Sequence, residues 1–264
     1  MMALRYMTKM MKKKTVKSTT TRRFYFGKKA LFLFIGMLFV GLLAMGYVLF
    51  PRVVQPPHIS DYAIHGFDVS HHQGDIAWRK IDQKHYAFVF IKATEGGDYQ
   101  DPKFQMNWLN AREVGLKVGA YHFFRNCKTG AEQAENYIRT VPKKHDSLPP
   151  VMDLEFQWTC PEVTAEQLQQ EITIMAQRLE QHYERKPIFY TTPKYYQAYI
   201  QAKLGHYPLW IQDTKKMPVR WDKRPWLFWQ YSHTGKMAGV ATVVDLNVFR
   251  GSRQQFMDFS MPKY

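Results

Sequence analysis

The stretch Pro149-Pro150-Val151-Met152-Asp153-Leu154-Glu155-Phe156 places two carboxylates two residues apart within an apolar run. The prolines end whatever element precedes them, and the apolar residues predict a buried strand that ends in acid. Because residues i and i+2 of a strand point to the same face, Asp153 and Glu155 should point together. Two acids held this close in a partly apolar setting do not both ionise freely, so at least one pKa should be raised, as a general acid requires. The alternative interpretation is a pair of structural acids bound by neighbouring Lys or Arg.

Strand-like and helical segments alternate on both sides of this stretch. Strands are predicted over residues 64–70, 86–94, 117–124, 187–191, 207–212, 226–231 and 241–247. Helices are predicted over 76–83, 102–114, 130–141, 164–185 and 193–202, two of them opened by capping boxes at Thr129 and Thr164. This alternation is typical of parallel βαβ units, and the number and spacing of the strands favour a closed, TIM-like α/β barrel that has lost its last helices. An open doubly wound sheet is the alternative, but no Gly-rich phosphate loop follows the first strand.

Polar and aromatic residues gather where the predicted strands end. In a barrel of this kind the site lies at the C-terminal ends of the strands. Ion pairing has no reason to place acids at equivalent ends of separate strands, so their recurrence predicts an acid-rich pocket with aromatic walls. Carboxylates that protonate a glycosidic oxygen, beside rings that stack on sugars, are typical of a glycosidase. The residues at these ends are Asp68, Lys92, Glu95, Tyr121, His122, Asp153, Glu155, Tyr190, Trp210, Gln212, Gln230 and Asp245.

The net charge of +15 is concentrated near the N-terminus. Residues 1–29 carry ten Lys or Arg and no acid, and residues 30–50 carry no charge at all. An apolar run of this length spans a bilayer, and the basic block before it predicts a cytoplasmic N-terminus. We therefore expect a basic cytoplasmic tail over 1–29, a transmembrane helix over 30–50, a linker over 51–63 and an extracytoplasmic catalytic domain over 64–264. This is the topology of a single-pass cytoplasmic (inner) membrane protein; a signal peptide cleaved near Ala44-Met45-Gly46 is the alternative.

The exported part is only mildly basic. Residues 53–264 hold 26 Lys or Arg against 22 Asp or Glu, so a nucleic-acid partner is not expected. Cys127 and Cys160 lie 33 residues apart with no neighbouring Cys or His, which argues against a zinc site. An even number of cysteines outside the cytoplasm fits one disulfide. His71 and His72 are adjacent and give little support for a metal site, so no cofactor is predicted.

Five motifs, in order, resemble glycoside hydrolase family 25, whose members are muramidases (lysozymes). The likeness covers about residues 64–252 and implies a barrel with five βα units and three further strands. The motifs are His65-Gly66-Phe67-Asp68-Val69-Ser70, Phe90-Ile91-Lys92-Ala93-Thr94-Glu95-Gly96, Gly119-Ala120-Tyr121-His122-Phe123, Pro150-Val151-Met152-Asp153-Leu154-Glu155, and Trp229-Gln230-Tyr231 with Val244-Asp245-Leu246-Asn247.

The resemblance also implies an activity and residue roles. The expected reaction is cleavage of the β-1,4 bond between N-acetylmuramic acid and N-acetylglucosamine in peptidoglycan, with net retention. Glu155 would be the general acid, Asp153 its partner carboxylate, and Asp68 and Asp245 supporting acids. Expected substrate contacts are Tyr121, Tyr190, Gln230, Lys92, Glu95 and Trp210, although the tyrosines could equally be core residues and Lys92 with Glu95 a buried ion pair.

Two further expectations follow from placing the motifs on a barrel. Cys127 follows the third strand and Cys160 the fourth, so a Cys127–Cys160 disulfide would join neighbouring loops beside the site. His122 should face away from Tyr121 and pack inside the fold.

A non-catalytic peptidoglycan-binding scaffold is the alternative function, and the intact set of four acids argues against it. A chitinase is disfavoured because the residues before Asp153 lack the Asp-x-x-Asp-x-Asp-x-Glu pattern.

Overall fold

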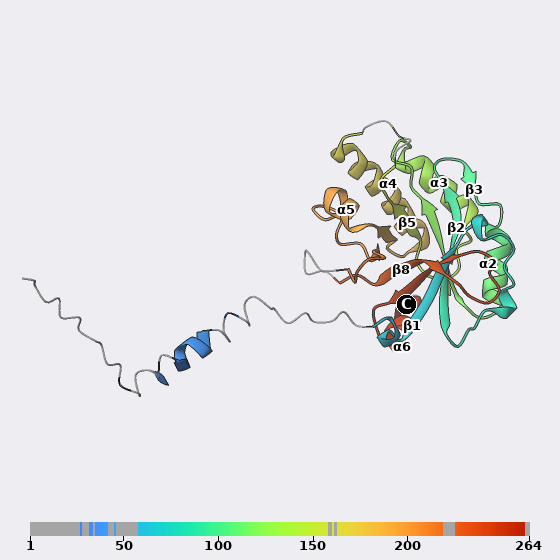
Figure 1. Ribbon diagram of the computed structural model, residues 1–264. Coiled ribbons are helices and arrows are strands. Elements are labelled where there is room, and N and C mark those ends of the chain that lie inside the picture. The colour runs from blue at the N-terminus through green and yellow to red at the C-terminus, as the bar shows by residue number, and fades with distance from the viewer. Residues whose placement is uncertain are drawn as a thin grey trace, which may run out of the picture. The chain divides into compact units, whose positions relative to one another are not determined.

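The computed structural model describes residues 58–157, 160, 163–218 and 225–261, together with residues 27, 32, 33, 35–41 and 45 (Figure 1). The chain divides into two compact units, Met1–Gln55 and Pro56–Tyr264. The predicted transmembrane helix over 30–50 lies largely outside the described residues and is not confirmed. Its described residues are helical and exposed, and no helix among the described residues is long and apolar enough to cross a membrane.

A nine-stranded sheet forms the centre of the second unit, within the part that the structure describes. Its order is β1-β9-β8-β7-β6-β5-β4-β2-β3, and β1 also pairs with β2, so eight strands close into a barrel and β3 lies outside the ring. The predicted α/β barrel is therefore confirmed. The strands are β1 (Ile64–Val69), β2 (Tyr86–Glu95), β3 (Tyr99–Gln100), β4 (Lys117–Phe123), β5 (Val151–Leu154), β6 (Ile188–Thr191), β7 (Leu209–Gln212), β8 (Phe228–Gly235) and β9 (Val244–Phe249).

The alternation predicted parallel strands, but the barrel is not parallel throughout. Strand β9 pairs antiparallel with both β8 and β1, whereas β1–β2, β2–β4 and the pairs from β4 to β8 are parallel. The physical reason is the connection over residues 236–243, which contains no helix and is too short for a parallel crossover.

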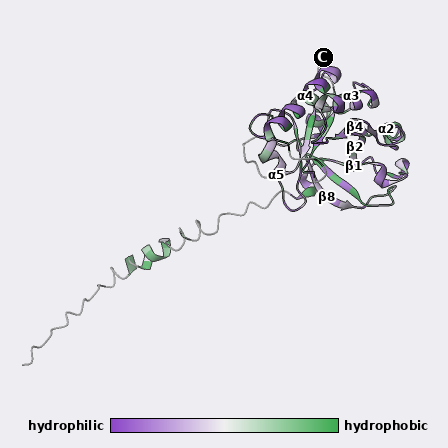
Figure 2. Ribbon diagram, turned by 90° about the horizontal axis from the view of Figure 1, so that it is seen from above, coloured by the Kyte–Doolittle hydropathy of each residue, from purple (hydrophilic) through white to green (hydrophobic). Residues whose placement is uncertain are grey.

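Helices cover the outside of the barrel (Figure 1). Their outer faces are mostly polar, and the apolar strands lie within (Figure 2). Both predicted capping boxes are present: Thr129 is the N-cap of the helix that begins at Gly130, and Thr164 is the N-cap of the helix that begins at Ala165. The helices are α2 (Phe104–Glu113), α3 (Gly130–Thr140), α4 (Ala165–Tyr183), α5 (Pro193–Tyr195, continued by a π-helix over Tyr196–Ile200) and α6 (Arg253–Ser260), with 3₁₀ turns at Ile59–Asp61, His71–Gln73 and Trp78–Lys80.

Alternate residues of each strand serve two cores. On β2, Phe88 and Phe90 point into the barrel, and Val89 and Ile91 pack under the helices. The inner core is aromatic: the ring of Phe90 stacks on Trp210, and their centroids lie 4.6 Å apart. This filling makes the barrel solid, so functional groups can gather only at its ends.

The structure differs from the prediction at four elements. The predicted helix over 76–83 is only the 3₁₀ turn Trp78–Lys80, and neither β3 nor α6 was predicted. The helix predicted from residue 102 begins at Phe104. Asp101, which with Pro102 had indicated the start of this helix, is not its N-cap residue: its Oδ2 atom accepts from the backbone N–H of His71 and lies 2.8 Å from the His71 Nδ1 atom, and its Oδ1 atom accepts from the backbone N–H of Lys103 at 2.9 Å.

Candidate active site

A cavity of about 230 Å³ opens at the C-terminal ends of the parallel strands. Residues from β1, β2, β4, β5, β6 and β7 or the loops directly after them contribute its walls, as the strand-end argument predicted. Asp245 joins them from the start of β9, not from its end, because that strand runs antiparallel to its neighbours. The cavity brings together all four predicted catalytic acids. It is lined by Asp68, Ser70, His72, Lys92, Tyr121, Phe123, Asp153, Glu155, Tyr190, Trp210 and Asp245.

Asp68 is held by a chain of buried hydrogen bonds. Its Oδ2 atom accepts from the Nδ2 atom of Asn247 at 2.8 Å and from the Nε2 atom of Gln230 at 3.0 Å. The oxygen atoms of the same two amides accept hydrogen bonds in turn. The Asn247 Oδ1 atom accepts from the Trp210 indole at 2.9 Å, and the Gln230 Oε1 atom accepts from the Tyr190 hydroxyl at 2.9 Å. Because each amide both donates and accepts, its orientation is fixed, and so is the carboxyl of Asp68.

Burial raises the pKa of Asp68 well above its usual range, and the neighbouring Asp245 raises it further. The two amide donors oppose this shift because they stabilise the charged form. Asp68 and Asp245 are directly paired in register between β1 and β9, which explains their mutual effect. The pocket therefore holds a carboxyl group that is geometrically fixed but reluctant to ionise.

Asp153 lies near the end of β5, paired in register with Tyr190 of β6. Its side chain lines the cavity, and its Oδ1 atom is buried without a hydrogen-bond partner among the described residues. Burial raises the pKa of Asp153 well above its usual range and Glu155 adds to this, whereas Lys92 opposes it. The residue lines the cavity, so its carboxyl group lies close to the position of a bound ligand.

Glu155 follows the last residue of β5 and is less buried than Asp153. Burial raises the pKa of Glu155, and the charge of Asp245 adds to the effect. Burial also raises the pKa of Asp245, while His233, whose Nδ1 atom lies 3.8 Å from the Asp245 Oδ1 atom, opposes it. All four acids therefore favour the protonated form more than a free carboxyl group does, which suits proton donation.

Lys92 and Glu95 form the ion pair that was one of the two interpretations for them. The Lys92 Nζ atom lies 2.6 Å from the Glu95 Oε2 atom, and the Arg125 Nε atom donates to Glu95 Oε1 at 2.8 Å. Burial alone would raise the pKa of Glu95, but the two cations outweigh it and lower the pKa. Lys92 lines the cavity and Glu95 does not, so only Lys92 is placed to meet a ligand.

The other predicted contact residues fall into two groups. Tyr121, Tyr190 and Trp210 line the cavity. Gln230 is 1% exposed and lies behind the wall, where it holds Asp68 and Tyr190. His122 packs inside as expected, with its Nδ1 atom 2.7 Å from the Thr94 hydroxyl and its Nε2 atom 3.1 Å from the Gln133 amide oxygen.

Sequence reasoning missed four residues of the site and its support. Ser70, His72 and Phe123 line the cavity, and Asn247 holds Asp68. Asn247 carried a signal, because it lies two residues after Asp245 on the same strand and so on the same face. Ser70 and His72 come directly after β1, where the chain turns and periodicity no longer indicates direction.

The predicted disulfide joins two loops at this end of the barrel. Cys127, after β4, is bonded to Cys160, after β5, and their Cα atoms lie 5.2 Å apart. Gln157 reinforces the connection, since its Oε1 atom accepts from the backbone N–H of Asn126 at 3.2 Å and its Nε2 atom donates to the Phe124 carbonyl. The loop that carries Glu155 is thereby tied to its neighbour. Among the described residues, no group of three or more His, Cys, Asp or Glu is arranged to hold a metal ion.

A family model for glycosyl hydrolases family 25 matches residues 67–240, which include the second half of β1, all of β2 to β8 and three of the four acids. The chain belongs to this family. Glycosyl hydrolases family 25 includes enzymes named lysozyme and N,O-diacetylmuramidase, and the chain is accordingly a glycoside hydrolase. It is 32% identical to Lysozyme M1 of Streptomyces globisporus over 218 residues, which cover 78% of this chain and 74% of that protein. It is also 32% identical to the uncharacterized protein YegX of Escherichia coli K12 over 205 residues, or 76% and 74% of the two chains.

Solved structures of family 25 share the barrel. A family 25 glycosyl hydrolase from Bacillus anthracis is 40% identical, with a TM-score of 0.72 over 77% of this chain and 96% of that one. The bacterial lysozyme from Streptomyces coelicolor is 31% identical, with a TM-score of 0.69 over 75% and 96%. The likeness covers the barrel and its acid pocket but leaves about a quarter of this chain unmatched.

Proposed function

We propose that this chain is an N-acetylmuramidase that cleaves the β-1,4 bond between N-acetylmuramic acid and N-acetylglucosamine in peptidoglycan. The observation that carries the proposal is the cavity at the C-terminal ends of the strands, where four carboxyl groups with raised pKa meet aromatic walls. The family includes lysozymes and N,O-diacetylmuramidases, and these names support the same substrate class.

In this proposal Glu155 is the general acid. Its pKa is raised by burial and by Asp245, so the side chain keeps its proton to a higher pH than a free carboxyl group and can give it to the leaving glycosidic oxygen. Its position after β5, at the edge of the cavity, lets it approach a bound glycan. The same group then accepts a proton from the water that completes hydrolysis.

Asp153 is the partner carboxylate in this proposal. Lys92 opposes the rise in the pKa of Asp153, which favours a charged carboxylate facing the oxocarbenium-like centre. Its carboxyl group, which lines the cavity, can either attack the anomeric carbon or accept the N–H of the substrate's acetamido group, whose oxygen would then attack. Inhibition by a stable thiazoline analogue of the cyclised acetamido intermediate would favour the second route; a trapped glycosyl-enzyme ester on Asp153 would establish the first.

Asp68 and Asp245 support the reaction in this proposal without donating the proton. Asp68 is oriented by Asn247 and Gln230, and Asp245 faces it across β1 and β9. Their partial negative charge stabilises positive charge that develops on the sugar ring in the transition state. Tyr121, Tyr190 and Trp210 would supply the surface against which the sugar lies.

The direct test is digestion of purified peptidoglycan by the parent protein and by Glu155→Gln. We expect muropeptides with reducing N-acetylmuramic acid ends from the parent, and a rate lower by about 10²–10⁴-fold from the variant, because Gln cannot donate the proton. Glu135→Gln makes the same change at an exposed position of α3 outside the cavity lining, and this matched control should retain parental activity. Intact glycan that binds the parent protein without cleavage would contradict the proposal and indicate a binding scaffold.

We also propose that residues 30–50 anchor the chain in the cytoplasmic membrane, with the barrel on the extracytoplasmic side. The uncharged run and the ten basic residues before it support this topology. Cell fractionation and protease treatment of intact spheroplasts would test it. Recovery of the full-length chain in the soluble fraction, or protection of the barrel from external protease, would contradict it.

A further inference from the structure

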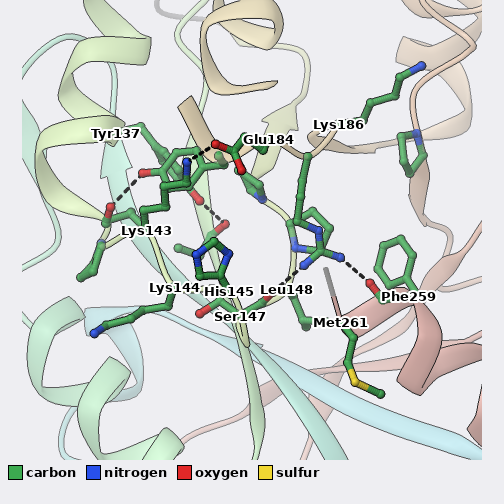
Figure 3. A pocket seen from close by; sticks show the side chains of 18 of the residues that line it. Tyr137, Lys143, Lys144, His145, Ser147, Leu148, Glu184, Lys186, Phe259 and Met261 are labelled. Carbon is green, nitrogen blue, oxygen red and sulfur yellow. Dashed lines mark hydrogen bonds and ion pairs between the residues drawn. The ribbon is translucent and has the colours of Figure 1, made fainter. Parts of the chain in front are cut away.

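A second cavity of about 490 Å³ lies at the opposite end of the barrel from the acids (Figure 3). Its lining includes Leu148 to Pro150 just before β5, Lys186 just before β6, and Pro208 just before β7. These are the N-terminal ends of parallel strands, whereas the acids lie at the C-terminal ends. The four residues of β5 separate the two sites by about 13 Å of strand.

A third cavity, of about 610 Å³, continues the second one past the end of α3 and along α2 to the loop that precedes Phe104. The two share Trp108, Pro142 and Lys144 in their linings. We call the two together the basic groove. Each volume is in the range of ligand-binding cavities, and their continuity suits an extended ligand rather than a compact one.

The groove carries an excess of positive charge. Arg139, Lys144 and Lys186 are exposed, line the groove and have no carboxylate partner among the described residues. Figure 3 shows Lys144 and Lys186 extending from different sides of the cavity, with His145 between them. Two further cations are already engaged: the Lys143 Nζ atom lies 2.8 Å from the Glu184 Oε1 atom, and Arg112 pairs with Asp146.

Hydrogen bonds from side chains to backbone carbonyls hold the floor of the groove. The Arg185 Nη1 atom donates to the Ser147 carbonyl at 2.7 Å, and its Nη2 atom donates to the Phe259 carbonyl. The Tyr183 hydroxyl donates to the Val141 carbonyl at 2.8 Å. The guanidinium group of Arg185 therefore adds a positive charge fixed by backbone carbonyls, beneath the mobile lysine side chains.

We infer that the basic groove binds the stem-peptide carboxylates of a peptidoglycan strand other than the one in the acid pocket. The inference rests on the proposed function, because it takes the ligand to be the proposed substrate. Charge complementarity supports it: stem peptides carry repeated carboxylates, and the groove presents separated cations along two continuous cavities. Because the three exposed cations lie at the opposite end of the barrel from the acids, stem peptides bound to them lie outside the acid pocket. The groove would hold the enzyme on the wall between cleavages.

The test measures binding of Glu155→Gln, which is expected not to degrade the ligand, to insoluble peptidoglycan freed of attached phosphate polymers. Adding Arg139→Gln, Lys144→Gln and Lys186→Gln should weaken co-sedimentation about tenfold at low salt, since each exposed ion pair contributes modestly. The matched control adds Lys80→Gln, Lys84→Gln and Lys203→Gln, which remove the same charge from exposed positions outside the groove and should change binding less than twofold. Thermal unfolding verifies that each variant is folded.

Two further arms identify the ligand. The difference between groove and control variants should vanish when the peptidoglycan carboxylates are amidated, and should shrink as salt screens the charges. Equal binding by the groove and control variants would overturn the inference. A difference that persists on amidated peptidoglycan, or appears only when phosphate polymers are left attached, would overturn it too. Failure of the proposed function would show separately, as absence of cleavage by the parent in the digestion assay.

Discussion

Lys92 is the residue whose positive charge opposes the effect of burial on the acid pocket. Its ammonium group opposes the raised pKa of Asp153 and also binds Glu95. Glu95 has a second cation, Arg125, so it keeps a partner when Lys92 is removed. The consequence of losing Lys92 should therefore fall on Asp153.

Lys92→Met is expected to move the acidic limb of the pH–rate profile to higher pH. Without the nearby positive charge the pKa of Asp153 rises further, so a higher pH is needed to ionise it. Peptidoglycan hydrolysis on the acidic side should fall roughly tenfold, and less near the alkaline limb. Lys92→Arg retains the charge and should keep the limb in place. An unchanged limb in Lys92→Met would show that ionised Asp153 is not required.

Individual residues of the pocket differ in how far sequence could reveal them. Asp68, Asp153, Glu155 and Asp245 were predictable because a carboxyl group at a strand end is rare without a role and four of them recur. Gln230 was identified, but as a contact residue, and the structure places it behind the wall. The sequence shows to which face of a strand a side chain points. Whether that side chain reaches the cavity or lies behind its lining depends on how neighbouring strands pair, which the sequence does not show.

At the scale of elements, α3 and α4 approach closely at one point. A Cβ atom built on Gly130 would lie 2.0 Å from the Glu171 carbonyl oxygen and 2.9 Å from the Met175 nitrogen. The Gly130 N–H also donates to the Glu171 side chain at 2.6 Å. The start of α3 thus packs directly on the backbone of α4, and only glycine fits there.

Gly130→Ala is expected to lower the free energy of unfolding by about 2 kcal/mol, because backbone atoms must separate to admit the methyl group. Urea unfolding measures the change. Gly97→Ala is the matched control, since its nearest neighbour would be the Glu132 Cβ atom at 3.6 Å, an ordinary contact. The control should change stability by less than about 0.5 kcal/mol. Equal losses in the two variants would show that α3 and α4 can move apart freely.

Elements with strong local signals were predicted well. Thr129 and Thr164 each start a helix because their side chains cap it, and this chemistry is local. Asp101 has the same local signal but instead binds His71, which lies 30 residues earlier. The direction of β9 was missed for a similar reason, because pairing with β1 depends on the closure of the whole barrel.

At the scale of the whole molecule, the acid pocket should lower the free energy of unfolding as pH rises. Its acids have folded-state pKa values above their ordinary values, so the folded protein binds more protons than the unfolded chain. Their contribution to stability is complete below the ordinary carboxyl pKa and is lost as pH rises through the raised values.

Asp153→Asn should therefore be more stable than the parent near neutral pH, by a margin that shrinks toward pH 4 and below, where both proteins lack the charge. Urea unfolding at several pH values measures the margin. Asp258→Asn, which replaces an exposed acid of α6, should show no such trend. A margin that is constant with pH, or that grows toward acid, would show that burial of the Asp153 charge is not the cause.

The closure of the barrel by its first and last strands also determines when the acid pocket is complete during synthesis of the chain. The hydrogen bond from Asn247 to Asp68 spans 179 residues, and β1 has no antiparallel partner until β9 has been made. A ribosome-bound chain that ends before β9 holds Asp153 and Glu155 but leaves Asp68 without Asn247 and without Asp245. Nascent chains and products truncated before residue 244 are therefore incomplete at the pocket itself.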